Sequence, residues 1–95
     1  MNRKGILEAA SKAVHAEDKD HDYGSPEDNF GTIAKLWTVY LDASHDAHVL
    51  FDARDVAAMM VLLKIARVAT SNKADNWIDI AGYAACGGEI DDGTE

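Results

Sequence analysis

The sequence has few of the residues that would assign it to several large classes of protein. It has one cysteine, Cys86, which excludes a disulfide within the chain and is typical of a reducing compartment. It contains no apolar run long enough for a membrane span. The first residues lead into an amphipathic pattern instead of the apolar core of a signal sequence. Together these features predict a cytoplasmic protein that has no membrane partner.

Positive charge is also scarce. Nine Lys and Arg residues stand against 17 Asp and Glu residues, which gives a formal net charge of -8. A chain with this balance is not expected to bind the backbone of a nucleic acid. It permits a basic protein partner, although an acidic surface more often serves solubility alone. The length of 95 residues and apolar content of 47% predict one small folded domain over 1–95, with an acidic tail over 89–95.

Familiar catalytic motifs are missing as well. There is no glycine-rich phosphate loop, no zinc-protease motif and no hydrolase elbow. His45 and His48 have a spacing seen in metal sites, but no third ligand is evident, so a solvated pair is expected. Cys86 lies beside glycines without an activating base, which argues against a nucleophilic role.

Helix signals are clear and strand signals are poor. Residues 3–16 place apolar side chains at helical spacing. A polar linker is predicted over 17–25. A second helix then begins after Ser25, which is a good N-cap and is followed by the single proline, Pro26, at a position suited to it. Residues 44–51 are predicted to form a loop.

The third predicted helix, 53–69, is apolar almost all round, which is typical of the central helix of a bundle. The short connection over 70–73 favours an antiparallel neighbour over 74–86, which the glycines at 87–88 are expected to end. The predicted fold is all-α, a compact four-helix bundle. Its core would be thin and the segment 81–88 is rich in small residues, so we expect a homo-oligomer to complete it.

Four charged residues on the last two helices form a candidate site. Lys64 and Arg67 are three residues apart and share a face, while Asp75 and Asp79 are four apart and share another that Tyr83 continues. Charges within apolar helices are costly unless they are paired or bound to something. The two cations suit phosphate oxygens, and the two carboxylates suit Mg²⁺.

Structural roles explain the charged residues of these two helices equally well. Asp52 and Asp55 have the spacing of a capping box, and Asn72 with Asp75 has it too. The two cations can extend to solvent or neutralise nearby acids. At this level a binding site and a purely structural set are equally supported.

Five segments carry a resemblance to known proteins; they are residues 23–30, 33–37, 55–60, 63–67 and 75–83. In their order they resemble a small phage and prophage family of unassigned function, over nearly the whole chain. More distantly they resemble the MazG-like all-α nucleoside-triphosphate pyrophosphohydrolases and the phage nucleotide-modification-associated domain. The resemblance implies an oligomeric, MazG-like bundle that handles a phosphorylated nucleotide, in the host cytoplasm if a phage encodes it.

The resemblance also implies roles for individual residues. Tyr23, Asn29 and Tyr83 would contact the ligand together with Lys64 and Arg67. Apart from Asn29, which belongs to the segment that resembles the phage family, these residues match the Tyr-Gly turn, the Lys/Arg-bearing middle helix and the final tyrosine that the MazG-like proteins share.

The acid set departs from the MazG-like pattern. Those enzymes bind Mg²⁺ through Glu-x-x-Glu on one helix and Glu-x-x-Asp on the next, where this chain has Asp52-x-x-Asp55 and Asn76-x-x-Asp79. Asp75 lies one residue, about 100° of helix rotation, from position 76. In the enzyme hypothesis Asp55, Asp75 and Asp79 would bind Mg²⁺ as the cofactor.

Fewer carboxylates mean a weaker metal site and weaker activation of water. The sequence therefore favours a protein that captures a nucleotide without a cofactor, with a host immune signalling nucleotide among the candidates, so that it would act against host defence. The alternative is a MazG-like, Mg²⁺-dependent nucleoside-triphosphate pyrophosphohydrolase. An acidic interaction protein without a small-molecule site ranks below both.

Overall fold

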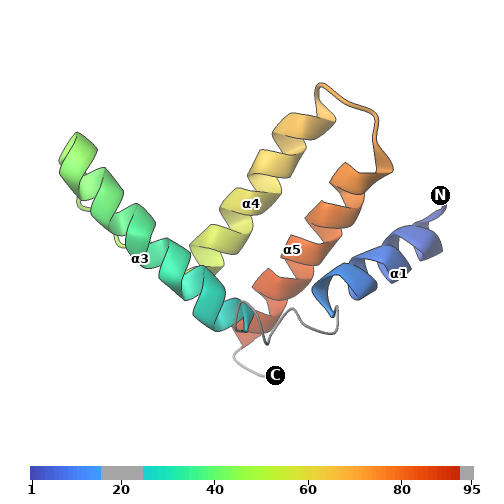
Figure 1. Ribbon diagram of the computed structural model, residues 1–95, viewed down its shortest axis with the longest axis horizontal. Coiled ribbons are helices and arrows are strands. Elements are labelled where there is room, and N and C mark those ends of the chain that lie inside the picture. Colours follow the sequence, from blue (N-terminus) through green and yellow to red (C-terminus); the bar gives the residue numbers. More distant parts are fainter. Residues whose placement is uncertain (16–24, 93–95) are drawn as a thin grey trace.

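The computed structural model describes residues 1–15 and 25–92, and the regular structure in these ranges is helical throughout. Strands are absent from both ranges, so the prediction of an all-α fold is confirmed. Not one of the described helices is both long and apolar enough to cross a membrane. The predicted linker over 17–25 falls almost wholly outside the described residues. The helices are α1 (Arg3–Val14), α3 (Pro26–His45), α4 (Ala53–Val68) and α5 (Ala74–Asp92), as Figure 1 shows.

Two helix starts form as the sequence predicts. The Ser25 side chain accepts a hydrogen bond from the backbone N–H of Asp28 at 3.2 Å, and Pro26 occupies the first helical position of α3. At α4 the Asp52 carboxylate accepts from the N–H of Asp55 at 2.9 Å, while the Asp55 carboxylate accepts from the N–H of Asp52 at 3.0 Å. This reciprocal pair is a complete capping box. The Asp55 side chain therefore has a structural role at the start of α4.

The chain after α3 folds back along that helix. The loop begins at Asp46, slightly later than predicted, and Asp46 adopts a left-handed conformation with φ of 52°. Phe51 then donates its backbone N–H to Thr38 Oγ1 at 3.0 Å. The rings of Trp37 and Phe51 meet edge to face at 5.9 Å. The return loop thus packs on α3 through the side chains of Trp37 and Phe51.

The predicted end of the last helix is wrong, because α5 continues through Gly87 and Gly88 to its last turn. A Cβ built on Gly87 would lie 3.1 Å from the Cβ of Ala57, so this glycine permits close approach of α4 and α5. Beyond the glycines, Arg54 Nη1 lies 3.2 Å from Asp91 Oδ1 and ties the last turn of α5 to the start of α4. Part of the predicted acidic tail is therefore helical.

The two adjacent glycines should respond differently to alanine. A Cβ on Gly88 would meet nothing within 4 Å, so Gly88→Ala is expected to stabilise the protein by about 0.5–1 kcal/mol through better helix propensity. Gly87→Ala should give a smaller gain or none, because its Cβ would press on Ala57. Urea denaturation of both variants measures the difference. An equal gain from both would show that Gly87 has no role in helix contact.

The centre of the molecule is the antiparallel pair of α4 and α5. The helix α4 packs on both α5 and α3, and α5 packs on both α4 and α1. In Figure 1, α3 leans away from α4, and α1 lies beside α5. Val56 is fully buried, with an exposed fraction of 0%. The core cluster around it consists of Phe30, Ala34, Val56 and Ala57.

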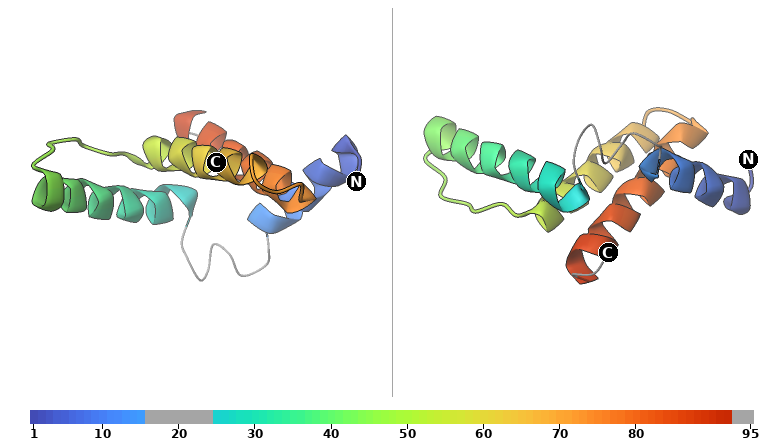
Figure 2. Two further views of the ribbon diagram at one scale, coloured as in Figure 1. Left: turned by 90° about the horizontal axis from the view of Figure 1, so that it is seen from above. Right: turned by 60° about the horizontal axis from the view of Figure 1, so that its bottom comes forward.

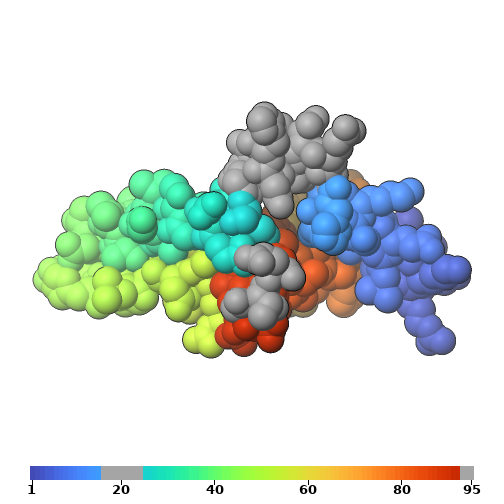
Figure 3. Space-filling model, turned by 90° about the horizontal axis from the view of Figure 1, so that it is seen from below, coloured from blue at the N-terminus to red at the C-terminus, as the bar shows by residue number. Residues whose placement is uncertain are grey.

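The arrangement is more open than the predicted compact bundle. The radius of gyration is 14.5 Å, compared with about 12.4 Å expected for 95 residues in a compact domain. The extents are 45 × 33 × 23 Å, with α3 at one end and α1 at the other (Figures 2 and 3). The physical reason is that α3 joins the core cluster only through residues 30–37, and α1 packs on α5 outside that cluster.

Candidate functional site

The relative positions of α4 and α5 determine which charged residues can meet. Near the start of α4, Ala57 faces Gly87 on α5. Near its end, Lys64 Nζ lies 3.0 Å from Asp79 Oδ2. Residue numbers rise along α4 as they fall along α5, so the two helices are antiparallel as predicted. The predicted cationic and acidic faces therefore meet at the pair of Lys64 and Asp79.

Lys64 is a partly buried cation in an apolar helix. Its side chain is 18% exposed, whereas that of Asp79 is 40% exposed. Between Asp55 and Arg67, α4 carries no other charged residue. Removal of an ammonium group from water is costly unless an anion or hydrogen bonds compensate. The Asp79 carboxylate supplies that compensation within the chain.

The end of α4 near the α5 start carries a second cation and a buried asparagine. One further turn in the same register brings Arg67 level with the first turn of α5, where Asp75 and Asn76 lie. Arg67 is exposed and makes no ion pair with any described residue. Asn76 is only 7% exposed as a residue, but no buried side-chain nitrogen or oxygen among the described residues lacks a hydrogen-bond partner. The Asn76 amide makes no hydrogen bond within 1–15 or 25–92 and therefore reaches solvent, where it can bind water or a ligand.

The three candidate metal ligands are spread along the helix pair. Asp55 precedes Lys64 by nine residues, which is about 14 Å along the helix axis. Asp75 is exposed in the first turn of α5, and Asn72 lies two residues before α5 begins, so the predicted Asn72 cap is not formed. In the described part of the chain, these carboxylates do not form a group whose ligand atoms could reach one ion. A Mg²⁺ site made of Asp55, Asp75 and Asp79 remains a prediction.

Two of the ligand contacts that the resemblance implies, Asn29 and Tyr83, lie in α3 and α5. The Tyr83 ring lies 6.2 Å from that of Phe30, between centroids. Asn29 is the half-buried neighbour of Phe30, so it belongs to the same region at the start of α3. Tyr23 lies outside the described residues. The structure therefore places Tyr83 beside Phe30, the residue that follows Asn29, and about one helical turn from Asp79.

A shallow depression of about 240 Å³ lies between α4 and α5. The pair of Arg54 and Asp91 forms part of its lining, together with Tyr83 and the two glycines of α5. Ligand pockets typically measure about 300–1,000 Å³, and neither Lys64 nor Arg67 lines this depression. One chain therefore does not enclose a whole nucleotide in this depression.

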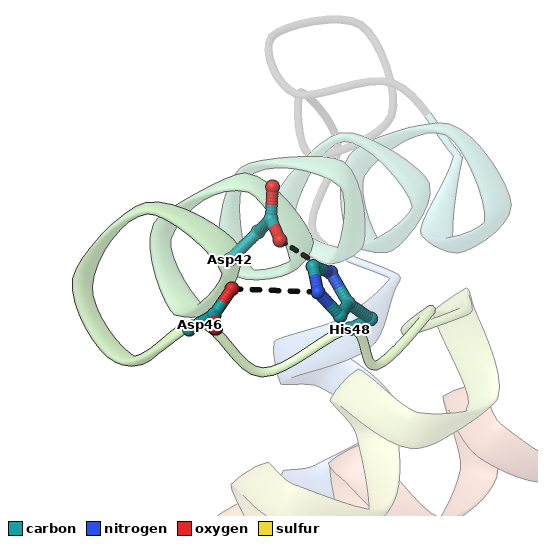
Figure 4. Close-up of side chains that lie close together, drawn as sticks. All are labelled: Asp42, Asp46 and His48. Atoms are coloured by element: carbon teal, nitrogen blue, oxygen red, sulfur yellow. Dashed lines mark ion pairs between the residues drawn. The ribbon is translucent and has the colours of Figure 1, made fainter.

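The histidine pair from the sequence is separated in the structure. His45 packs its ring against Tyr40, whereas His48 lies between two carboxylates at the end of α3 (Figure 4). His48 Nδ1 lies 2.6 Å from Asp42 and Nε2 lies 3.4 Å from Asp46. The two carboxylates face different ring nitrogens, and a metal ion binds only one of these at a time. The close contacts of His48 with the two carboxylates make this an exposed polar cluster at the end of α3.

Comparison with known proteins identifies the relatives of the chain. The model of the family described as Domain of unknown function (DUF6378) matches residues 5–91. The chain belongs to this family. Among its relatives, the Gene 55 protein of Mycobacterium phage D29 is 40% identical over 84 residues, which are 87% of this chain and 51% of the relative. The Gene 55 protein of Mycobacterium phage L5 is 40% identical over 80 residues, which are 83% of this chain and 47% of the relative.

The chain thus spans about half the length of these curated relatives. No solved structure matches it. The predicted relationship to phage proteins is confirmed by the two relatives.

Proposed function

We propose that this protein binds a phosphorylated nucleotide and holds it intact, and that it does so as a homo-oligomer. The observation that carries the proposal is the polar group at one end of the α4 and α5 pair. There a partly buried lysine has a single carboxylate partner among the described residues, beside an arginine without an ion pair to them and an asparagine amide that reaches solvent. These features supply cations for phosphate and an amide for a polar group of the ligand.

Charge makes this location distinctive. The chain has a net charge of -8, so an anionic ligand is repelled by most of its surface. Lys64 and Arg67 are cations close together on one helix, and Arg67 can bind two phosphate oxygens through its planar fork. A phosphate beside Lys64 would share with Asp79 the role of neutralising the partly buried ammonium group. The distant MazG-like resemblance, which adds Tyr23, Asn29 and Tyr83 as ligand contacts, points to the same class of ligand.

The positions of the acids favour capture over hydrolysis. Asp79 is paired with Lys64, and Asp55 is engaged in the capping box at the other end of α4. A single chain therefore offers Mg²⁺ a weak set of ligands near the two cations. The MazG-like pyrophosphohydrolase alternative would need Asp55, Asp75 and Asp79 to converge from more than one chain. In the host cytoplasm, capture of an immune signalling nucleotide would remove that signal without destroying it.

Titration calorimetry against a panel of nucleoside triphosphates and cyclic dinucleotides tests the proposal. At least one of them is expected to bind, and exchange of MgCl₂ for EDTA is expected to change the Kd by less than about threefold, or roughly 0.7 kcal/mol. Asp79→Asn should preserve or tighten binding, because it removes a negative charge near the phosphate. Binding that requires Mg²⁺ and is lost in Asp79→Asn would support the pyrophosphohydrolase. No binding across the panel would refute both.

A further inference from the structure

We propose that a second copy of this chain covers the outer face of α4. By this name we mean six exposed apolar residues on the solvent side of that helix. The inference goes beyond the nucleotide proposal because it assigns the surface of self-association, and its test uses no ligand. The six residues are Ala58, Met59, Leu62, Leu63, Ile65 and Ala66.

The outer face of α4 has the composition of a buried surface. At about 100° per residue, its six members occupy one continuous side of the helix. No charged residue lies among them, because Lys64 turns toward Asp79 on α5. Asp55 and Arg67 bound the face at its two ends. Single exposed apolar residues are ordinary, but a continuous uncharged strip along a helix indicates an interaction site.

Within the described part of the chain, the neighbouring helices contact α4 on another side and near its start. The buried residues Val56 and Ala57 face the core, as does the partly buried Met60. Ala57 is rotated away from the outer face of α4, whereas Val56 lies two turns before Leu63 on nearly the same side. The core cluster therefore covers the start of this side and leaves its later turns exposed. In Figure 1, α3 diverges from α4 and does not fold over it. Leu62 remains 65% exposed as a result.

The whole chain exposes more surface than a compact monomer of its mass. The accessible surface is 6912 Å², compared with about 5,350 Å² expected for a compact monomer of 10.3 kDa. The excess is about 1,550 Å² per chain. A standard interface buries about 800 Å² per partner, and obligate homodimers bury about 2,000–5,000 Å² in total. The excess is spread over the whole surface, of which the outer face of α4 is one part, and it leaves room for a dimer interface of at least the standard size.

A second copy fits this surface better than a transient partner. The described core has only five buried apolar residues, so the fold needs a permanent partner to bury its exposed apolar surface. A second copy of the chain is always available in a one-to-one ratio. An isologous contact of the outer face of α4 with itself supplies this cover. The face carries no charge, so the acidic surplus of each copy stays outside the contact.

The small residues of α5, which the sequence suggested as the contact, are used within the chain. A Cβ on Gly82 would lie 3.2 Å from Val14 of α1, and one on Gly87 would lie 3.1 Å from Ala57 of α4. These glycines let neighbouring helices of the same chain approach closely. The self-association surface therefore moves from α5 to α4.

Sedimentation equilibrium from low to high micromolar concentration tests the assignment. The wild type is expected to have at least twice the 10.3 kDa mass of one chain. Leu62→Glu should shift it to the monomer, whereas Leu7→Glu on α1, at a site exposed to almost the same extent (64%), should leave the assembly intact. A monomeric wild type would overturn the proposal. So would an oligomer that Leu7→Glu disrupts and Leu62→Glu does not.

A second pair of variants guards against misfolding. Leu62→Ala and Leu7→Ala keep strong helix propensity and remove the same side chain. Leu62→Ala is expected to raise the dissociation constant of the oligomer at least about tenfold, and Leu7→Ala should not change it. Unfolding of Leu62→Ala alone would also support the proposal, since loss of an exposed leucine in a monomer is nearly neutral. Equal assembly of both variants would contradict it.

Discussion

Phe30→Ala is expected to remove most of the stability of this protein. Phe30 is buried in the core cluster, where its ring meets that of Tyr83. Truncation of a buried phenylalanine costs about 3–5 kcal/mol, through lost burial and the cavity left behind. Domains of this size have about 5–14 kcal/mol in total, and so small a core belongs at the low end. We expect thermal unfolding near or below 37 °C by circular dichroism.

Leu36→Ala is the matched control, because Leu36 lies on the same helix but is exposed. It should change the free energy of unfolding by no more than about 0.5 kcal/mol. A similar loss of stability in both variants would mean that the outer side of α3 is as buried as the core cluster. A small loss in Phe30→Ala would contradict the location of the core.

Arg67→Ala is expected to weaken nucleotide binding by about ten- to a hundredfold. The guanidinium at the end of α4 makes no ion pair with a described residue, so in the proposed function its positive charge is available to phosphate. Loss of one charged hydrogen bond typically costs about 1.5–3 kcal/mol. Titration calorimetry with the tightest nucleotide of the panel measures the loss, and circular dichroism checks that helicity is unchanged.

Arg54→Ala provides the control for loss of a positive charge from the same helix. Arg54 lies at the other end of α4 and pairs with Asp91 on the surface, so its replacement should change nucleotide affinity little. Equal losses in the two variants would mean that only the overall charge matters. If Arg67→Ala unfolds, Arg67 has a structural role, and the proposal that it contacts phosphate is wrong.

Local signals in the sequence predicted the helix starts well. Ser25 with Pro26, and Asp52 with Asp55, each satisfy backbone groups within one turn, so their effect is independent of distant residues. The stop at the glycine pair failed for the opposite reason. Gly87 is retained in the helix because α4 approaches it closely, and that contact is tertiary.

The openness of the fold could not be read from the sequence either. The apolar pattern of α4 identifies a helix with several covered sides, but it does not say which chain covers each side. Val56 is buried within the chain, whereas Leu63, two turns further along on the same side, is 46% exposed. A periodic pattern is the same in both cases.

The candidate site could likewise be predicted only in part from the sequence. Spacing placed Lys64 and Asp79 on faces that could meet, and the antiparallel pairing of α4 and α5 brings them together. Spacing did not separate Asp55 from Asp79 along the pair, because that depends on the register of two helices. The burial of Asn76 was also missed, although its place one turn before Asp79 and two before Tyr83 on an inward face was a usable signal.

Recovery of the bound nucleotide tests the central claim most directly. The protein is incubated with its tightest nucleotide in the presence of MgCl₂, washed, heated to release the ligand, and the supernatant is analysed by chromatography with mass detection. Capture predicts that the nucleotide returns chemically intact, in amounts that match the protein bound, with or without EDTA during incubation. Steady formation of pyrophosphate and a nucleoside monophosphate by the wild type, lost in Asp79→Asn, would contradict capture and make pyrophosphohydrolysis the function.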